Sequence, residues 1–526
     1  MYSRVFYTAV FLLCLAADFA PAVDRTEVLA TMKRATAFMT ETVSYQGGYV
    51  WNYLTDFSRR WGEMEATKTM IWIQPPGTPA MGHLFLDAYH ATGDETYYHA
   101  AEQTADALIK CQHESGGWNY VADLAGEDSL RRWYDTIGKN GWRLEEFQHY
   151  YGNATFDDKT TSEAARFMLR MALEKNNLRY KAALDRAVAF VLNSQYPAGV
   201  WPQRYPLKYD FSKDGRPDYT SFMTFNDEVT AENIDFLILC YQALGDARFL
   251  EPIHRAMNAF LVTQQAAPQA GWALQYTTDL QPAGARSYEP KALVTSTTAE
   301  NIGQLLKFYT LTGEVKFLER IPEALDWLDS VKLPPSLGMF RSSHPTFVEL
   351  GTNEPLFIHR TGSNVINGRY YADKNPQNTV GHYSSVRFID MTALRNSFEQ
   401  ARAIDPNDAK QNSPLRPGAP ARDLPRFFSL RSRRQSRSIR PSESQVERII
   451  NSLNTQGYWP SRLRSTSNPY KGDGPKEVTP GDFSQTNVGD TYDTSPYPSR
   501  KPITCISTTT YIRNMSALIL YLESES

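Results

Sequence analysis

Cysteine, clustered histidine and long apolar runs are all scarce in this chain of 526 residues. The four cysteines form no CxxC pair, so we expect neither a disulfide framework nor a structural zinc site. The nine histidines are scattered without an HxxxH pair, which argues against transition-metal binding. Because the net charge is only −3, no global basic field predicts nucleic acid as a partner. Any attraction for anions must be local.

The N-terminus has the features of a secretory signal. Arg4 precedes an apolar stretch from Val5 to Ala17, and the small residues 20–22 (Ala-Pro-Ala) match a cleavage site. We therefore predict a signal peptide at residues 1–22 and a secreted or periplasmic protein. The apolar run is shorter than the ~20 residues that a membrane span needs. No second stretch is long enough, so no span is expected in the mature chain.

Amphipathic helices recur along the chain up to about residue 331. Apolar residues at helical spacing mark the segments 101–108, 184–192, 253–261 and 321–328. Three of these segments follow an earlier helix and a turn in which glycine precedes an acidic residue, at residues 93–94, 245–246 and 313–314. The exits repeat as well, running from Gln to Trp at 112–118, 195–201 and 265–272. Units of ~70 to 80 residues predict stacked or circularised helical hairpins.

The predicted fold class is mainly α, with an α/α toroid of helical hairpins at residues 23–335. An open solenoid is the competing architecture. Two capping boxes, at residues 160–163 and 297–300, predict helix starts. Beyond the hairpins we expect an irregular region at 336–402 and a Pro/Ser/Arg-rich linker or excursion at 403–445, whose arginines are interpreted as a solvated basic tract. The C-terminal segment 446–526 is expected to pack back on the main domain.

The segment from residue 201 to 228 concentrates aromatic rings, arginines and carboxylates between two helical patterns. The ring of Trp201 can stack on a sugar, and Arg204 can form a bidentate pair with a carboxylate. Asp227 and Glu228 offer hard oxygen ligands to a divalent cation. In the alternative interpretation the segment is a structured loop, Trp201 belongs to the core and Asp227 caps a helix. These residues alone leave both possibilities open.

Five short motifs follow one another in a specific order. They are NATFDD at 153–158, WPQRYPL at 201–207, TFND at 224–227, WALQ at 272–275 and ARSYE at 285–289. In this order they resemble polysaccharide lyase family 10, a family of pectate lyases. The resemblance extends to the segment ELGTNEPLFIHRTG at 349–362 and covers roughly residues 148–371.

The resemblance implies an α/α toroid with an irregular, strand-containing second region, and a cleft between the two. It also implies calcium-assisted β-elimination on polygalacturonate or a related uronan, an anionic polysaccharide. By motif match, Asp227 occupies the calcium-ligand position and Arg360 the position of the arginine that acts as base. With no sign of nucleic acid or membrane partners, we expect a monomer that binds Ca²⁺ and uronan.

The implied chemistry explains why arginines and a metal belong together. The proton at C5 of a uronosyl ring is very weakly acidic, because its loss adds negative charge beside an ionised carboxylate. Calcium and arginines at that carboxylate neutralise the charge as it develops. An arginine base conflicts with its usual pKa above ~12, but nearby cations and desolvation increase the neutral fraction.

Several further residues are candidates for substrate binding. Arg286, Arg204 and Arg369 are candidate ligands of a substrate carboxylate, although Arg286 could equally pair with Glu289. Trp201 and Trp272 are candidates for sugar stacking, with the core as the alternative.

The chain departs from the family pattern at two acidic positions. Where the family has an acidic residue soon after the Trp-x-x-Gln motif, this chain has Thr277, and Asp279 could substitute for it. After Arg360 the expected aspartate is Thr361. These changes could weaken calcium binding, change the uronate polymer or remove activity.

Two other classes of function stay open at this point. One is a non-catalytic uronan-binding protein. The other is a toroid glycoside hydrolase, in which Asp227 would face Asp157 or Asp158 across a sugar.

Overall fold

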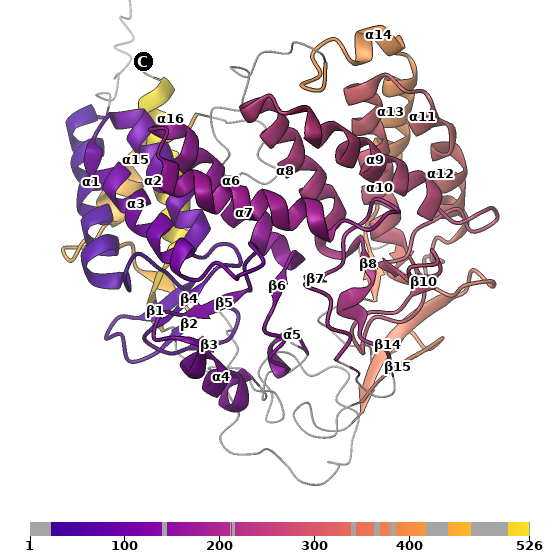
Figure 1. Ribbon diagram of the computed structural model, residues 1–526, viewed down its shortest axis with the longest axis horizontal. Helices are drawn as coiled ribbons and strands as arrows, with labels where there is room; N and C mark the ends of the chain where they lie inside the picture. Colours follow the sequence, from indigo (N-terminus) through magenta and orange to yellow (C-terminus); the bar gives the residue numbers. More distant parts are fainter. Residues whose placement is uncertain are drawn as a thin grey trace, which may run out of the picture.

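Helical hairpins form the body of the computed structural model, and short strands lie along one side of them (Figure 1). The structure describes residues 23–138, 145–210, 212, 216–337, 343–361, 369–377, 379, 385–416, 440–463 and 503–524, without the side chains of Arg360, Thr361 and Arg369. The predicted signal peptide at 1–22 lies outside the described residues, as does much of the predicted excursion, at 417–439. Among the described residues, no helix has the length and apolar character that a membrane crossing requires.

The α-helices are α1 (Arg25–Phe38), α2 (Thr78–Thr92), α3 (Glu95–Lys110), α4 (Glu127–Thr136), α5 (Glu145–Gln148), α6 (Thr160–Glu174), α7 (Leu178–Ser194), α8 (Val229–Leu244), α9 (Leu250–Thr263), α10 (Thr295–Thr312), α11 (Lys316–Glu319), α12 (Ile321–Ser330), α13 (Met391–Arg402), α14 (Pro406–Ala409), α15 (Glu443–Ser452) and α16 (Thr508–Ser524). Short helical turns are η1 (Met39–Val43), η3 (Asp157–Lys159), η4 (Tyr219–Ser221), η5 (Asn226–Glu228) and η6 (Ala247–Phe249).

The hairpins are arranged as an α/α toroid, as the sequence predicts. Inner and outer helices pack in the pairs α2 with α3, α6 with α7, α8 with α9 and α10 with α12. The inner helix α2 contacts both α16 and α6, α6 contacts α8, and α10 contacts α13. The last described helix, α16, also packs against the first, α1, so these two helices lie side by side although they are far apart in the sequence (Figure 1).

A repeated turn after the four helices α3, α7, α9 and α15 confirms the predicted Gln-to-Trp exits. Four indole N–H groups donate to a carbonyl near the end of the preceding outer helix, at 2.7–2.9 Å: Trp118 to Leu108, Trp201 to Val191, Trp272 to Phe260 and Trp459 to Ile449. Glutamine side chains then bind the next outer helix, as Gln112 does at Ala183 and Gln195 at Pro252. In the third exit this role falls to Gln264, one residue before the predicted position.

The exit turns approach the next outer helix so closely that two of them require glycine. A Cβ at Gly116 (φ 106°) would lie 2.1 Å from the Arg186 carbonyl oxygen, and one at Gly199 (φ 98°) would lie 2.4 Å from that of Arg255. Both glycines therefore allow neighbouring hairpins to dock.

We expect Gly199→Ala to lower the free energy of unfolding by about 1–3 kcal/mol, because it adds a backbone clash to the strain of positive φ. Gly245→Ala is the matched control, since Gly245 also has positive φ (67°) but nothing within 4 Å of its Cβ position. Urea denaturation of both variants measures the difference. Equal losses would contradict the docking role.

The strands are short and form several small sheets. They are β1 (Asn52–Leu54), β2 (Arg60–Trp61), β3 (Glu65–Ala66), β4 (Met70–Trp72), β5 (Val121–Asp123), β6 (Ala154–Thr155), β7 (Arg204–Tyr205), β8 (Met223–Thr224), β9 (Gln275–Tyr276), β10 (Pro282–Ala283), β11 (Leu293–Val294), β12 (His344–Pro345), β13 (Phe347–Val348), β14 (Pro355–Thr361), β15 (Arg369–Asp373), β16 (Val386–Arg387), β17 (Ser461–Arg462) and β18 (Thr504–Ser507). The sheets have the orders β17-β18-β1-β2-β3, β11-β13-β14-β15, β10-β9-β8, β12-β16, β4-β5 and β6-β7. Thus the region 336–402 contains strands and also the helix α13.

The predicted capping boxes do not cap their helices. The residue before α6 is Lys159, and α10 starts at Thr295, before the predicted box. The hydroxyls of Thr161 and Thr298 instead accept from the backbone N–H of Trp118 and Trp272, at 3.0 Å each. At positions 161 and 298 the threonine hydroxyl therefore connects an inner helix to the neighbouring exit turn by a hydrogen bond.

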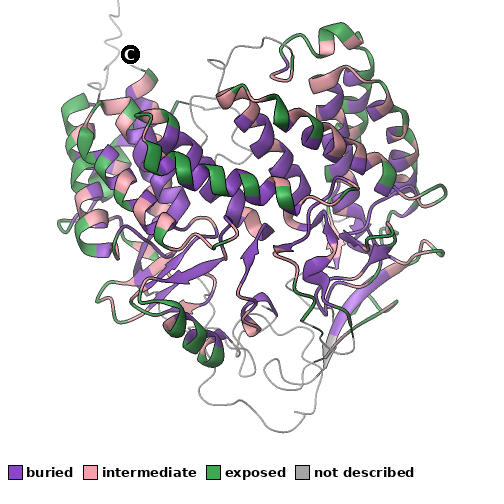
Figure 2. Ribbon diagram, viewed as in Figure 1, coloured by how far each residue is buried: buried purple, intermediate pink, exposed green. Residues whose placement is uncertain are grey.

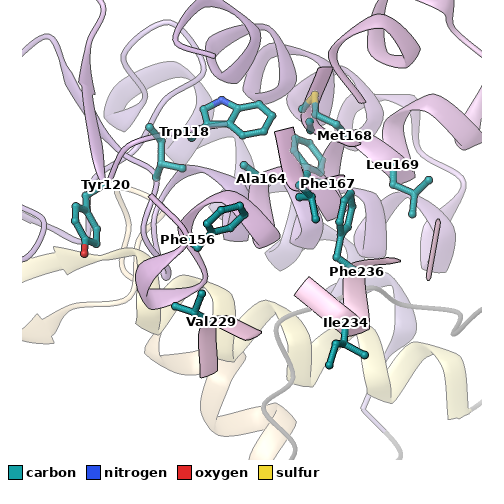
Figure 3. Packing of buried hydrophobic residues seen from close by; sticks show 14 of the residues in the cluster. Trp118, Tyr120, Phe156, Ala164, Phe167, Met168, Leu169, Val229, Ile234 and Phe236 are labelled. Carbon is teal, nitrogen blue, oxygen red and sulfur yellow. The ribbon is translucent and has the colours of Figure 1, made fainter. Parts of the chain in front are cut away.

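The main core lies between the inner and outer helices. In Figure 2 the inward faces of the helices are buried and the outer face of α7 is exposed. Figure 3 shows one part of this core, where Phe156, just before η3, lies near Val229, the first residue of α8. A second, smaller apolar cluster joins the segment around Tyr288 to β13 and β14. This packing fixes the inner-helix N-termini relative to the strands.

Candidate active site

Two matching turns lie at the N-termini of the neighbouring inner helices α6 and α8. The first, η3, follows β6 in the sequence TFDDK, and the second, η5, follows β8 in the sequence TFNDE. In each turn two consecutive residues have left-handed backbone: Asp158 (φ 49°) and Lys159 (φ 61°), then Asp227 (φ 48°) and Glu228 (φ 60°). The turns contact each other. Such conformations cost about 1–3 kcal/mol each outside glycine, and they cluster at functional sites.

Arg286 lies at the centre of the carboxylates that these turns present. Its Nη2 is 2.5 Å from Asp157 Oδ2, and its Nη1 is 3.8 Å from Asp227 Oδ2. Its Nε donates to Glu146 Oε2 at 3.3 Å, and its Nη1 donates to Glu289 Oε1 at 3.4 Å. The side chain is only 2% exposed. One buried guanidinium therefore faces four carboxyl groups.

The short helix α5 holds the turn that carries Arg286. Glu146 binds the guanidinium, and the neighbouring Glu145 accepts from both the backbone N–H and the hydroxyl of Ser287. All of these groups are buried. The hydrogen bonds hold the Arg286 side chain in place, so that it faces η3 and η5.

The pKa values of the site's carboxyls are shifted in different directions. Burial raises the pKa of Asp227 well above its ordinary value, and the charges of Asp157 and Asp158 add to the effect. Burial, with Asp157 and Glu63, raises the pKa of Asp158 in the same way. For Asp157 burial acts in the same direction, but the Arg286 guanidinium and hydrogen bonds from Tyr120 and Gln203 lower its pKa overall.

Asp157 retains one oxygen that a proton or a cation can satisfy. Its Oδ2 accepts from Tyr120, Gln203 and Arg286. Its Oδ1 is buried and has no hydrogen-bond partner among the described residues. A cation near this oxygen would relieve the repulsion among the carboxylates.

These oxygens fit calcium in kind, because it prefers hard oxygen ligands. Among the residues that the structure describes, however, no group of three or more His, Cys, Asp or Glu side chains has the arrangement of a metal site. Calcium takes about 6–8 oxygen ligands, so substrate or water would have to complete the shell.

The structure does not bring together the predicted metal trio. Glu228 is paired with Lys159, at 2.9 Å. Asp279 lies in the exposed turn between β9 and β10 and accepts from Thr277, while the next residue, Leu280, lines an outer groove with α9. Of the three, only Asp227 belongs to the Arg286 cluster. Asp279 is wrong as a metal ligand because the hairpin carries it to the outer surface.

Trp201 and Trp272 are core residues and not sugar-stacking platforms. Both side chains are 0% exposed. Their indole N–H groups donate to carbonyls of the preceding outer helices in the exit turns. The Gln-to-Trp spacing in the sequence therefore indicates the helical repeat and not a substrate site.

Arg204 and Arg286 are also too buried to reach a substrate directly. Each is 2% exposed. Arg286 has formed the ion pair with Glu289 that the sequence left as an alternative. Arg204 donates to the amide oxygens of Asn119 and Asn153 and lies over the ring of Tyr151 at 4.4 Å. Both arginines therefore support the site through contacts with its other residues and not through the substrate.

The strand pair β14–β15 flanks the Arg286 segment. Arg360 is the register partner of Tyr370 in this pair. The ring of Tyr370 lies 5.3 Å from that of Tyr288, two residues after Arg286. The side chains of Arg360 and Arg369 lie outside the described residues. The backbone of Arg360 is nevertheless linked to the Asp227 cluster through Tyr370, Tyr288 and Arg286.

Sequence reasoning named Asp157 and Asp158 only for the hydrolase alternative, and it missed Glu145 and Glu146. Asp158 could have been assigned to the same site as Asp227, because the TFDD of η3 repeats as the TFND of η5, 69 positions later. Glu145 and Glu146 carry no such signal, since they come from a helix of 4 residues.

Comparison with known proteins gives the class of protein to which this chain belongs. The sequence model of the pectic acid lyase family matches residues 131–396, just over half of the chain. Among solved structures, the family 10 polysaccharide lyase from Cellvibrio cellulosa is 18% identical, with a TM-score of 0.40 over 65% of this chain and 100% of that chain. A point mutant of that lyase in complex with trigalacturonic acid matches with the same identity and TM-score over 61% and 98%. A GH76A α-1,6-mannanase from Salegentibacter sp. is 11% identical, with a TM-score of 0.36 over 95% and 99%. No curated protein sequence matches the chain.

The matched residues include both turns, Arg286 and the strand of Arg360. A helical toroid with this matched region belongs to the class of polysaccharide lyases. The chain is a member of the pectic acid lyase family.

Proposed function

We propose that this protein is a secreted pectate lyase that cleaves polygalacturonate, or a related uronan, by calcium-assisted β-elimination. The observation that carries the proposal is the Asp227 carboxyl, held 3.8 Å from a buried arginine at the meeting point of two strained turns. Trigalacturonic acid in the mutant complex of the Cellvibrio lyase supports a uronan as the substrate class.

The proposed cation site consists of Asp227 and Asp158, and oxygens of substrate and water would complete the shell. Asp227 is 31% exposed and Asp158 is also partly exposed, whereas Asp157 and Arg286 are almost fully buried, so a substrate can approach Asp227 and Asp158. Calcium bound there would supply positive charge beside the substrate carboxylate.

Two arginines of the chain have the other proposed roles. Arg286 keeps Asp157 ionised and holds the cluster, and its own pKa is raised well above the ordinary value: burial lowers it, but Asp157 and Glu146 raise it more. This guanidinium therefore stays cationic and is unsuited to act as the base. Arg360, on the strand that flanks the cluster, is the proposed base that takes the C5 proton.

The product distinguishes this proposal from the alternatives. The protein is incubated with polygalacturonate, with and without a calcium chelator, and the absorbance of unsaturated uronide ends is followed. We expect absorbance to rise with calcium and to stop with chelator. Reducing ends without this absorbance would indicate hydrolysis, and calcium-dependent retention on pectate without product would indicate a binding protein.

We expect Asp227→Ala to raise the calcium concentration needed for half-maximal elimination by about tenfold or more, because it removes one of the two partly exposed carboxylate ligands. Asp279→Ala is the matched control, and its calcium requirement should equal that of the wild type. Rates measured across a calcium titration compare the two variants. An unchanged requirement in Asp227→Ala would remove Asp227 from the cation site.

A further inference from the structure

Lys159 joins the two turns of the site at equivalent positions. It is the last residue of η3, and Glu228 is the last residue of η5. The Lys159 ammonium lies 2.9 Å from Glu228 Oε2 and 3.2 Å from Glu232 Oε1. One side chain on the first turn therefore holds both the second turn and the first turn of α8.

Glu232, the second partner of Lys159, is held in turn by buried residues of the toroid. The other carboxylate oxygen of Glu232 lies 2.6 Å from Arg166 Nη1, and Arg166 also binds Glu163 at 2.9 Å. Arg166, Glu163 and Glu232 are all buried. Lys159 therefore pairs with a residue of α8 that is itself buried and held by a second ion pair.

The ion pair between Lys159 and Glu228 joins two residues with strained backbone. Lys159 and Glu228 both have left-handed backbone, and each directly follows the aspartate that its turn presents. A left-handed pair outside glycine persists only where surrounding contacts hold it. The ion pair between Lys159 and Glu228 is such a contact for both turns at once.

We propose that Lys159 is a positioning residue that sets the spacing between Asp158 and Asp227 for cation binding. The inference rests on the proposed function, because it assumes that these carboxylates receive a cation. Lys159 does not touch the substrate in this role. It acts by holding two carboxylates, which repel each other, at a distance that one cation can bridge.

The test uses Lys159→Gln, with Lys159→Arg as the conservative variant and Lys175→Gln as the matched control. Lys175 follows the opposite end of α6, pairs with Glu95 at 2.8 Å and is 39% exposed, the same fraction as Lys159. Isothermal titration with calcium alone, without substrate, measures the affinity of each full-length variant. A calcium titration of the elimination rate is the second readout.

We expect Lys159→Gln to weaken calcium binding about tenfold, while the rate at saturating calcium stays within about twofold of the wild type. Lys159→Arg should recover most of the affinity, and Lys175→Gln should match the wild type. Calcium affinity equal to that of the wild type in Lys159→Gln would overturn the inference, even if this variant melts at a lower temperature. If the wild type binds calcium but forms no unsaturated ends, the lyase proposal fails and the titration still decides on Lys159. If the wild type binds no calcium, both fail.

Discussion

Arg360→Ala is expected to abolish the formation of unsaturated uronide ends while leaving the fold intact. Loss of the proposed base should lower kcat by about 10³-fold or more, since general base catalysis and charge stabilisation by this side chain are lost together. Absorbance assays at saturating calcium and polygalacturonate measure the loss.

A surface arginine provides the control for this prediction. Arg402 is 63% exposed, and its ion pair is with Glu399 of the same helix, so Arg402→Ala should keep full activity. Circular dichroism checks that Arg360→Ala is folded. Turnover close to that of the wild type in folded Arg360→Ala would reject Arg360 as the base.

Arg286→Ala is expected to have the largest effect on stability. Removing the guanidinium leaves Glu146, Asp157 and Glu289 buried without their counter-ion, which typically costs about 3–5 kcal/mol. The same change should abolish elimination, because Asp157 and Asp227 lose the group that holds them.

The comparison for Arg286→Ala is Arg395→Ala. Arg395 pairs with Asp326 and Asp329 at the surface and is 44% exposed, so its removal should cost less than about 1 kcal/mol. Urea denaturation at neutral pH measures both. Similar losses in the two variants would show that Arg286 does not neutralise the cluster.

Much of the fold could be predicted from the sequence because the repeat is local. The apolar stripes at 184–192 and 253–261 fall in α7 and α9, and the glycines at 93, 245 and 313 end their helices with left-handed backbone. Hydrophobic periodicity depends only on neighbours three and four residues away, so it survives without knowledge of the tertiary structure.

The site was only partly predictable, because its partners are distant in the chain. Asp227 was found through its motif, and it does lie at the Arg286 cluster. The partners of Arg286 are 129 and 140 positions away, at Asp157 and Glu146, and no local pattern predicts those contacts. For Trp201 and Trp272 the sequence left sugar stacking and the core open, because one residue type serves both, and burial decided for the core.

The sequence by itself determined the helical hairpins, the order of the family motifs and the presence of arginines and carboxylates that suit the proposed uronan substrate. Only the tertiary structure decided which of them meet. It placed Asp157, Asp227, Glu146 and Glu289 around Arg286, and it moved Asp279 to the outer surface. The physical reason is that periodicity and motifs are encoded between near neighbours, whereas the ionisation of a carboxyl depends on burial and on charges that folding brings from elsewhere in the chain.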